Sequence, residues 1–315
     1  MNPILKLLPI SHPIIQAGMV YVSGGKLAAA SAEAGILGVV GAGSMNPDLL
    51  DHHLKKAISL TSHPERLAVN IPLLYEKTNE QIEVSLKNGI KIFITSAGSP
   101  KTWTKFLKDK GCTVIHVTSS PELAKKCEDA GVDAVIAEGF EAGGHNGRDE
   151  ITTMVLIPQV IRAVKIPVIA AGGIGDGKGI AAAMALGAHG VQLGTRFLAT
   201  QESSAHPAFK KMIVDARSDS TMLMMKKVVP VRLVKNTFFE EVKTLEEKNA
   251  TKEELEKHLG KGRARAGMLE GDLVHGELEA GQIAAIVSDL PTVKDLTARL
   301  LKEYSEAVKS LALSI

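Results

Sequence analysis

Apolar residues along this chain gather in short continuous runs, separated by longer stretches in which they recur every three or four residues. Glycine, proline or asparagine bounds each short run, which is typical of strands. Because these runs do not alternate between apolar and polar positions, they indicate strands buried on both faces, as in a parallel sheet covered by helices. The pattern predicts eight strands, at 13–18, 37–43, 67–72, 91–98, 112–119, 133–139, 167–173 and 190–195.

The stretches between the strands have helical periodicity, and several end in glycine, which commonly terminates helices. Eight strand–helix units close into a barrel more readily than they form an open sheet, since so wide a sheet usually splits or flattens. We therefore predict an α/β fold, a (β/α)8 TIM barrel. A doubly wound sheet would need G-x-G-x-x-G after the first strand. The glycines of "GVVGAGSM" (38–45) follow the second strand and lack that spacing.

The pattern changes after Pro207. Residues 221–236 predict either a returning strand or a loop and a short strand, and residues 238–267 predict a charged pair of helices with a capping box at Thr251 and Glu254. Residues 292–315 predict a terminal amphipathic helix. The apolar faces of these helices can be buried either in a homodimer or against their own barrel.

Composition narrows the class of protein only slightly. The chain has 315 residues, and barrels of this kind often exceed ~250 residues as one unit. A net charge of +2 gives no case for a nucleic-acid partner. Two cysteines, Cys112 and Cys127, are too few for a disulfide framework, so we expect packing residues in a reducing cytoplasm. No apolar segment reaches ~18 residues, so we expect no membrane span.

Glycines follow the last two predicted strands, where such barrels commonly bind phosphate. Gly172 and Gly173 end the seventh strand, and Gly194 and Thr195 end the eighth. Bare backbone lets N–H groups approach an anion, although the same glycines would also suit tight turns. Gly18 and Met19 end the first strand and suit a flat ring system lying against the backbone. Flavin mononucleotide (FMN) combines a phosphate with such a ring.

His145 is the strongest candidate for chemistry. It follows Gly143 and Gly144 on a predicted loop and can exchange a proton near neutral pH. The alternative is a loop histidine that caps the next helix or binds water. We expect no metal site, because no H-x-x-x-H spacing or cysteine partner accompanies it. Other strand ends carry polar groups that could contact a flavin or simply cap turns: Asn70, Thr95, Ser96, His116, Thr118 and Glu138.

These segments together resemble the FMN-dependent nitronate monooxygenase (2-nitropropane dioxygenase) family, which includes the enoyl-acyl carrier protein reductases II. The resemblance covers essentially the whole chain and is carried by "HPIIQAGM", "AEGFEAGGHNG", "TTMVLIPQV", "IPVIAAGGIGDGKG", "GVQLGTRFLATQESSAH", "PVRLVKN" and "EGDLVHGELEAGQIA". Within the family, "AGSMNPDLLDHH", "VNIPLLY" and "TSAGSPKTWT" are most similar to the reductase II type of Bacteroidetes.

The resemblance implies an FMN-binding barrel core at 1–204, a small helical insertion at 205–265 and a segment at 266–315 that returns to the barrel. It also implies His145 as the catalytic histidine. The wording "EGDLVHGELEAGQ" departs from the family around Glu277 and Glu279, where substrate or cation contacts would differ. The cofactor-binding residues that it implies are Ala17, Gly18, Met19, Asn70, Glu138, Gly144, Gly172, Gly173, Gln192, Gly194 and Thr195.

Three functions fit this resemblance. The first is reduction of the 2,3 double bond of enoyl-acyl carrier protein thioesters by NADH or NADPH through FMN, with His145 assisting at the carbonyl or the α-carbon. The second is oxidation of alkyl nitronates with FMN and O2. The third is a flavin-binding protein without turnover. We favour the reductase because of the closer likeness, since a fold alone does not specify function.

Overall fold

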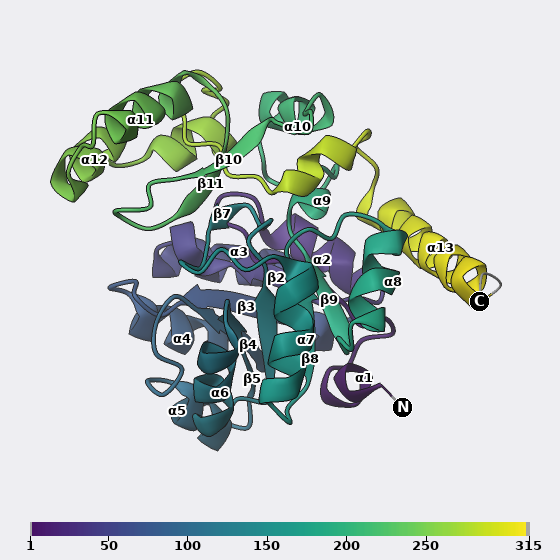
Figure 1. The fold of residues 1–315 in the computed structure, drawn as a ribbon. Helices are drawn as coiled ribbons and strands as arrows, with labels where there is room; N and C mark the ends of the chain where they lie inside the picture. Colours follow the sequence, from purple (N-terminus) through teal and green to yellow (C-terminus); the bar gives the residue numbers. More distant parts are fainter. Residues whose placement is uncertain (1, 313–315) are drawn as a thin grey trace.

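The computed structural model describes residues 2–312, and eight parallel strands form its centre (Figure 1). Their order is β1-β9-β8-β6-β5-β4-β3-β2, with every neighbouring pair parallel. All eight predicted strands are present, so the expected TIM-barrel fold is confirmed. The strands are β1 (Ile14–Gln16), β2 (Gly38–Gly41), β3 (Leu67–Pro72), β4 (Ile92–Ser96), β5 (Thr113–Thr118), β6 (Ala134–Glu138), β8 (Val168–Ala171) and β9 (Gly190–Leu193).

The sheet closes between its first two strands. Ile15 of β1 pairs in parallel with Leu37, directly before β2. The backbone N–H of Gln16 donates to Leu37 O at 3.0 Å, and the N–H of Leu37 donates to Ile14 O at 3.0 Å. The buried Gln16 side chain adds a second link, because its Oε1 accepts the backbone N–H of Val39 at 3.0 Å. Closure leaves neither β1 nor β2 as a free edge.

Successive strand residues point to opposite faces and fill two separate cores. Ile15 and Val39 belong to the cluster inside the barrel, whereas Ile14 and Val40 belong to the cluster between the strands and the outer helices. The helix α1 (Pro3–Leu7) packs against the inner cluster. Burial on both sides explains why the strands read as continuous apolar runs.

Helices surround the barrel and occupy most of the predicted stretches (Figure 1). The first seven outer positions follow their strands in sequence order, whereas the eighth is filled from the end of the chain. There α13 packs against both α8 and α2. The helices are α2 (Gly25–Glu33), α3 (Pro47–Leu60), α4 (Thr78–Lys87), α5 (Thr104–Asp109), α6 (Pro121–Asp129), α7 (Thr153–Ala163), α8 (Gly177–Ala185), α9 (Thr195–Leu198), α10 (Pro207–Val214), α11 (Thr237–Glu247), α12 (Lys252–Leu259) and α13 (Val293–Ala312).

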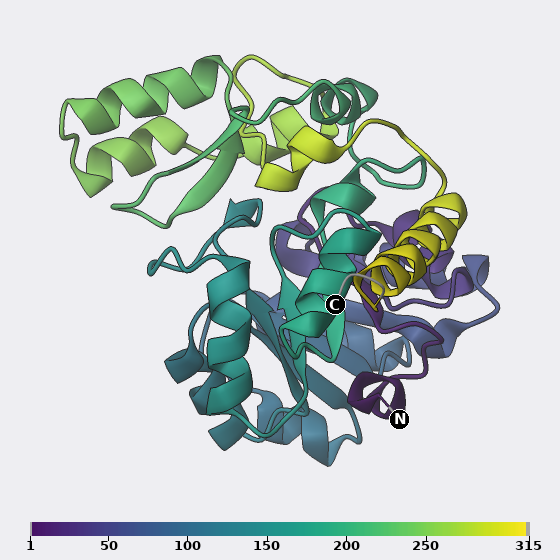
Figure 2. The same cartoon turned by 45° about the vertical axis from the view of Figure 1, so that its right-hand side comes forward.

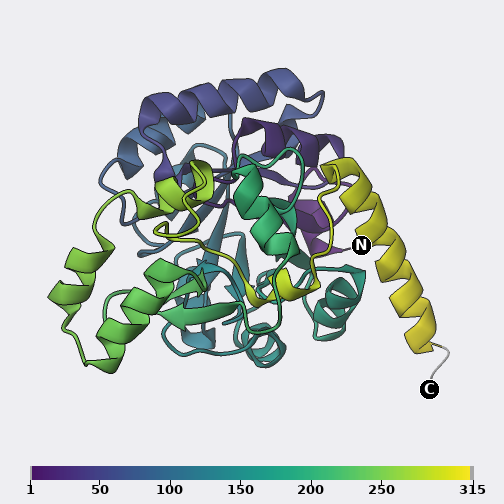
Figure 3. The same ribbon diagram turned by 90° about the horizontal axis from the view of Figure 1, so that it is seen from above.

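The terminal helix thus packs against its own barrel. Val293, Leu296 and Leu300 of α13 are buried in the outer core. Figure 3 shows the helix lying along one side of the barrel. The prediction for this helix extended to residue 315, and residues 313–315 lie outside the described part of the chain.

A second, smaller sheet lies above the barrel beside α11 and α12 (Figure 2). It joins β10 (Thr221–Met224), β11 (Val231–Val234) and β7 (Gly144–His145), all antiparallel. The segment predicted as helical, 205–265, therefore also contains a strand hairpin. The capping box of α12 is confirmed. The division into segments 1–204, 205–265 and 266–315 stays a prediction.

Two further expectations concern the cysteines and a membrane span. Cys112 and Cys127 are both free and buried, as packing residues would be. Burial raises the pKa of the Cys127 thiol to about 12, which keeps the thiol protonated. No helix within residues 2–312 has both the length and the apolar character needed to cross a bilayer.

Candidate active site

A cavity of about 950 Å³ opens where the strands end, beneath the small sheet. In barrels of this kind, that end carries the active site. All twelve predicted site residues line this one cavity, although they come from six strands or their following loops. They are Ala17, Gly18, Met19, Asn70, Glu138, Gly144, His145, Gly172, Gly173, Gln192, Gly194 and Thr195.

The glycines after β8 present bare backbone to the cavity. Gly172 and Gly173 adopt left-handed φ values of +86° and +67°. A β-carbon on Gly172 would lie 2.6 Å from Gly139 O, so the turn has no space for a side chain. Thr153 Oγ1 fixes the turn by donating to Gly172 O at 2.9 Å. This geometry suits the close approach of an anionic ligand group.

The end of β9 completes this side of the cavity. Gly194 lies against Met19, with the position of its absent β-carbon 3.6 Å from the Met19 sulfur. The Thr195 hydroxyl oxygen accepts the backbone N–H of Gly281 at 2.9 Å, which leaves the hydroxyl hydrogen available to a ligand. The returning chain after residue 266 therefore braces the predicted phosphate site.

Gln192 carries an unpaired polar atom. Its side chain is 7 % exposed, and its Oε1 is buried with no hydrogen-bond partner among residues 2–312. An orphaned buried acceptor is costly, about 1–3 kcal/mol. A ligand that brings an N–H donor into the cavity would satisfy it.

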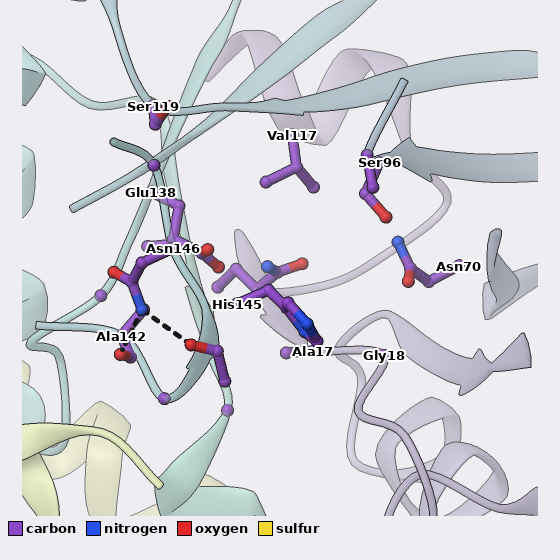
Figure 4. Close-up of a pocket in the computed structure, with 18 of the residues that line it drawn as sticks. Ala17, Gly18, Asn70, Ser96, Val117, Ser119, Glu138, Ala142, His145 and Asn146 are labelled. Atoms are coloured by element: carbon purple, nitrogen blue, oxygen red, sulfur yellow. Dashed lines mark hydrogen bonds between the residues drawn. The ribbon is translucent and has the colours of Figure 1, made fainter. Parts of the chain in front are cut away.

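His145 lies on strand β7, which corrects the expected loop. The strand pairs His145 with Val231 of β11, so the backbone of the histidine is held by the small sheet. The imidazole is exposed to the cavity and has no hydrogen-bond partner among residues 2–312. Figure 4 shows its ring and the Asn70 side chain directed toward the same space. The ring is thus free to contact a ligand.

The turn before His145 is also fixed. Asn146 Nδ2 donates to Ala142 O and to Gly144 O, both at 2.9 Å (Figure 4). Gly144 has a φ of +76°, and a β-carbon there would lie 2.5 Å from Glu279 Oε2. Glycine is therefore required by both the backbone conformation and the neighbouring carboxyl.

Three carboxyl groups with raised pKa values belong to this site: Glu277 is buried, whereas Glu138 and Glu279 are half-buried. Burial raises the pKa of Glu138 to about 7. Burial also raises the pKa values of Glu277 and Glu279, and for Glu277 repulsion by Glu279 adds to the effect. Glu138 and Glu279 line the cavity directly. Burial of charge without a partner favours the protonated acids, which can donate hydrogen bonds.

Sequence reasoning did not identify Glu141, Lys101 and Lys126, which also line the cavity. Glu141 accepts the backbone N–H and the hydroxyl of Thr153, each at 2.9 Å. Glu141 could have been found from the sequence, because it lies three residues after Glu138 in "AEGFEAGG", in the loop that follows β6. The lysines lie well beyond their strand ends, so no strand-end pattern marks them.

His116 is a neutral wall residue. Burial lowers its pKa to about 4, and its Nδ1 lies 2.7 Å from Thr95 Oγ1 on the neighbouring strand. It also lines the cavity. The ring is therefore a satisfied interior histidine that also forms part of the cavity wall, and a contact with flavin stays a prediction.

The fold and the cavity at its strand ends define a TIM-barrel protein with a ligand site at the usual end of the barrel. The chain belongs to the nitronate monooxygenase family, whose model matches residues 2–81 and 65–303. Proteins of this family are flavoenzymes, and the expectation of a catalytic flavin oxidoreductase is confirmed at that level.

Known relatives carry different activities. FabK from Thermotoga maritima is 40% identical, covers 100% of this chain and 99% of its own, and superposes with a TM-score of 0.94. Nitroalkane oxidase from Streptomyces ansochromogenes is 31% identical with a TM-score of 0.84, covering 98% of this chain and 99% of its own. A probable nitronate monooxygenase from Bacillus subtilis is 35% identical over 71% of this chain and 76% of its own.

A Gly172→Ala substitution tests the glycine turn. We expect FMN affinity to fall at least about ten-fold, because the new methyl group would meet Gly139 O and the residue would resist its φ. Fluorescence titration of the flavin-free protein measures this. Gly89→Ala is the matched control, since Gly89 has a φ of +80° with nothing within 4 Å. Equal FMN affinity in the wild type, Gly172→Ala and Gly89→Ala would show that the turn at Gly172 does not contact FMN.

Glu138 predicts a pH effect on stability. Its folded pKa of about 7 exceeds the ordinary 4.5, so its contribution to folding is greatest at low pH and is lost as pH rises through 7. Flavin-free Glu138→Gln should therefore gain about 1–3 kcal/mol relative to wild type between pH 5 and 8. Urea denaturation at both pH values measures this, with exposed Glu83→Gln as control. A difference independent of pH would refute the buried titration.

Proposed function

We propose that this protein is an FMN-dependent enoyl-acyl carrier protein reductase that uses NADH or NADPH. The likeness to FabK over the full length of both chains supports it, FabK being an enoyl-acyl carrier protein reductase II. The acidic inner wall of the cavity, formed by Glu138 and Glu279, favours this reaction over nitronate oxidation. Both candidate reactions need the same cofactor.

The residues present fit FMN. The bare backbone at Gly172 and Gly173, with the Thr195 hydroxyl, would hold the phosphate. Gly18 packs directly against Asn70, since a β-carbon there would lie 2.5 Å from Asn70 Cβ, and both residues line the cavity where the flat ring would lie. The unpaired Oε1 of Gln192 would accept an N–H from the polar edge of the ring. When bound, the flavin supplies hydride transfer between the nicotinamide and the substrate.

The charge of the inner wall favours a neutral substrate. Glu138 and Glu279 line the cavity, and desolvation raises the pKa of each carboxyl. With a pKa of about 7, Glu138 is partly ionised at neutral pH, so an anionic alkyl nitronate would meet like charge there. An enoyl thioester carries no charge at its reacting end and can accept hydrogen bonds from protonated acids. Of the residues 2–312 that line the cavity, the lysines are Lys101 and Lys126, and both are exposed.

His145 and the cavity volume suit the same reaction. The unpartnered imidazole can donate a hydrogen bond to the thioester carbonyl and deliver a proton to the α-carbon. Ligand cavities usually measure about 300–1,000 Å³, so 950 Å³ is at the upper end. That volume leaves space for a second ligand beside the cofactor.

Nitronate oxidation is the second candidate. The likeness to nitroalkane oxidase over 98% of this chain favours it. Where the neutral nitroalkane is the substrate, His145 would accept the proton next to the nitro group and so form the nitronate. The two candidates differ in their reductant and in the charge of their substrate, and both differences can be measured.

Anaerobic stopped-flow absorbance separates them. We expect NADH or NADPH to bleach the bound flavin, and crotonyl thioester to restore its colour, because the substrate accepts the electrons. A nitronate should bleach the flavin slowly or not at all. Flavin that stays oxidised with both nicotinamides but is bleached by a nitronate would make the protein a nitronate monooxygenase.

His145→Ala should retain FMN and lose turnover by at least about 100-fold, the usual contribution of a general acid or base. Steady-state oxidation of NAD(P)H with crotonyl thioester measures turnover, and the flavin absorbance of the purified variant measures occupancy. His275→Ala is the control, since His275 is exposed and outside the cavity lining. Turnover within about three-fold of wild type would exclude His145 from proton transfer.

A further inference from the structure

The rim of the cavity differs from its inner wall. We define the rim as Leu74, Lys101, Leu123, Lys126 and Val229, all of which line the cavity and are exposed. Leu74 is 80% exposed, Val229 43% and Leu123 41%. Exposed apolar side chains grouped at one opening indicate contact with a ligand or partner.

The two lysines lie on neighbouring parts of this rim. Strands β4 and β5 pair in parallel, with Thr95 opposite His116, so the chain leaves both strands at the same edge. Lys101 lies on the segment after β4, and Lys126 lies on α6, which follows β5. The Oγ of Ser120 caps α6 by accepting the N–H of Leu123 at 3.3 Å. The start of this helix thus faces the same opening.

Neither rim lysine has a counter-charge. Lys101 and Lys126 make no hydrogen bond or ion pair among residues 2–312. Lys125, the residue before Lys126, instead binds Glu128 at 2.8 Å and Asp129 at 2.6 Å. Two uncompensated ammonium groups at the opening of a cavity attract an anionic group of an entering ligand.

We propose that Lys101 and Lys126 bind the phosphate of a phosphopantetheine arm, with Leu74, Leu123 and Val229 contacting the rest of the arm. This inference rests on the proposed function, in which the substrate is a thioester on such an arm. The acidic inner wall accepts the neutral thioester, whereas the cationic rim accepts the phosphate. The order of these charges sets the direction in which the arm enters. The apolar rim favours the alkyl-amide arm over the polar riboses of a dinucleotide.

Direct binding tests this without turnover. The ligands are butyryl-phosphopantetheine and butyryl-pantetheine, which differ only in the phosphate, titrated calorimetrically into the flavin-loaded protein. We expect the wild type to bind the phosphorylated ligand about ten-fold more tightly, and the Lys101→Ala/Lys126→Ala variant to lose that preference. Lys125→Ala is the matched control and should keep it, since its ammonium group is already bound to Glu128 and Asp129. Added salt should reduce the preference in the wild type.

Each other outcome overturns one of the two proposals. Equal affinities for the two ligands in the wild type, or an equal loss in Lys125→Ala, would refute the rim site. A KM for NADH or NADPH that rises in the double variant, with thioester affinity unchanged, would assign the lysines to the dinucleotide and refute the arm. A wild type that prefers the phosphorylated ligand but reduces no crotonyl thioester would refute the reductase function and retain the lysine site. A wild type that reduces crotonyl thioester but shows no preference for the phosphorylated ligand would refute the lysine site and retain the reductase function.

Discussion

Closure of the barrel between Ile15 and Leu37 is the constraint on which the site depends. Parallel strands all end at the same edge, and closure turns that edge into a ring. Gly18 after β1 then meets Asn70 of β3 so closely that a β-carbon on the glycine would lie 2.5 Å from Asn70 Cβ. The buried Gln16 reinforces the closure through Val39. Residues separated by more than 170 positions thereby line one cavity.

The barrel supplies the wall of the cavity, whereas the later segments supply much of its chemistry. Strand β11 pairs with His145, and Leu233 of the same strand forms an antiparallel bridge with Glu279. Two residues further on, Gly281 donates to Thr195. The histidine, the carboxyl of Glu279 and the glycine-rich end of β9 are therefore held by one paired segment, formed by β11 and residues 279–281. Relatives that share the barrel can differ in activity through this segment, because it contacts each of them.

Electrostatics divides the cavity into two regions. Glu138 and Glu279 form part of the inner wall, where desolvation raises their pKa values and favours the neutral acids. Lys101 and Lys126 are at the rim, exposed to solvent. A ligand with a neutral reacting end and an anionic distal end matches this arrangement in one orientation only. In the proposed function, the enoyl thioester is such a ligand.

Local sequence determined the eight strands, because burial on both faces leaves a continuous apolar run, and it determined the capping box of Thr251 and Glu254, because both partners lie within one turn. It also marked His145 and the strand-end glycines. Only the tertiary structure decided that His145 lies in a strand against Val231, that α13 fills the eighth helix position, and that a carboxyl from residue 279 joins the site. These are contacts between distant segments, and no local periodicity encodes which distant partner a residue meets.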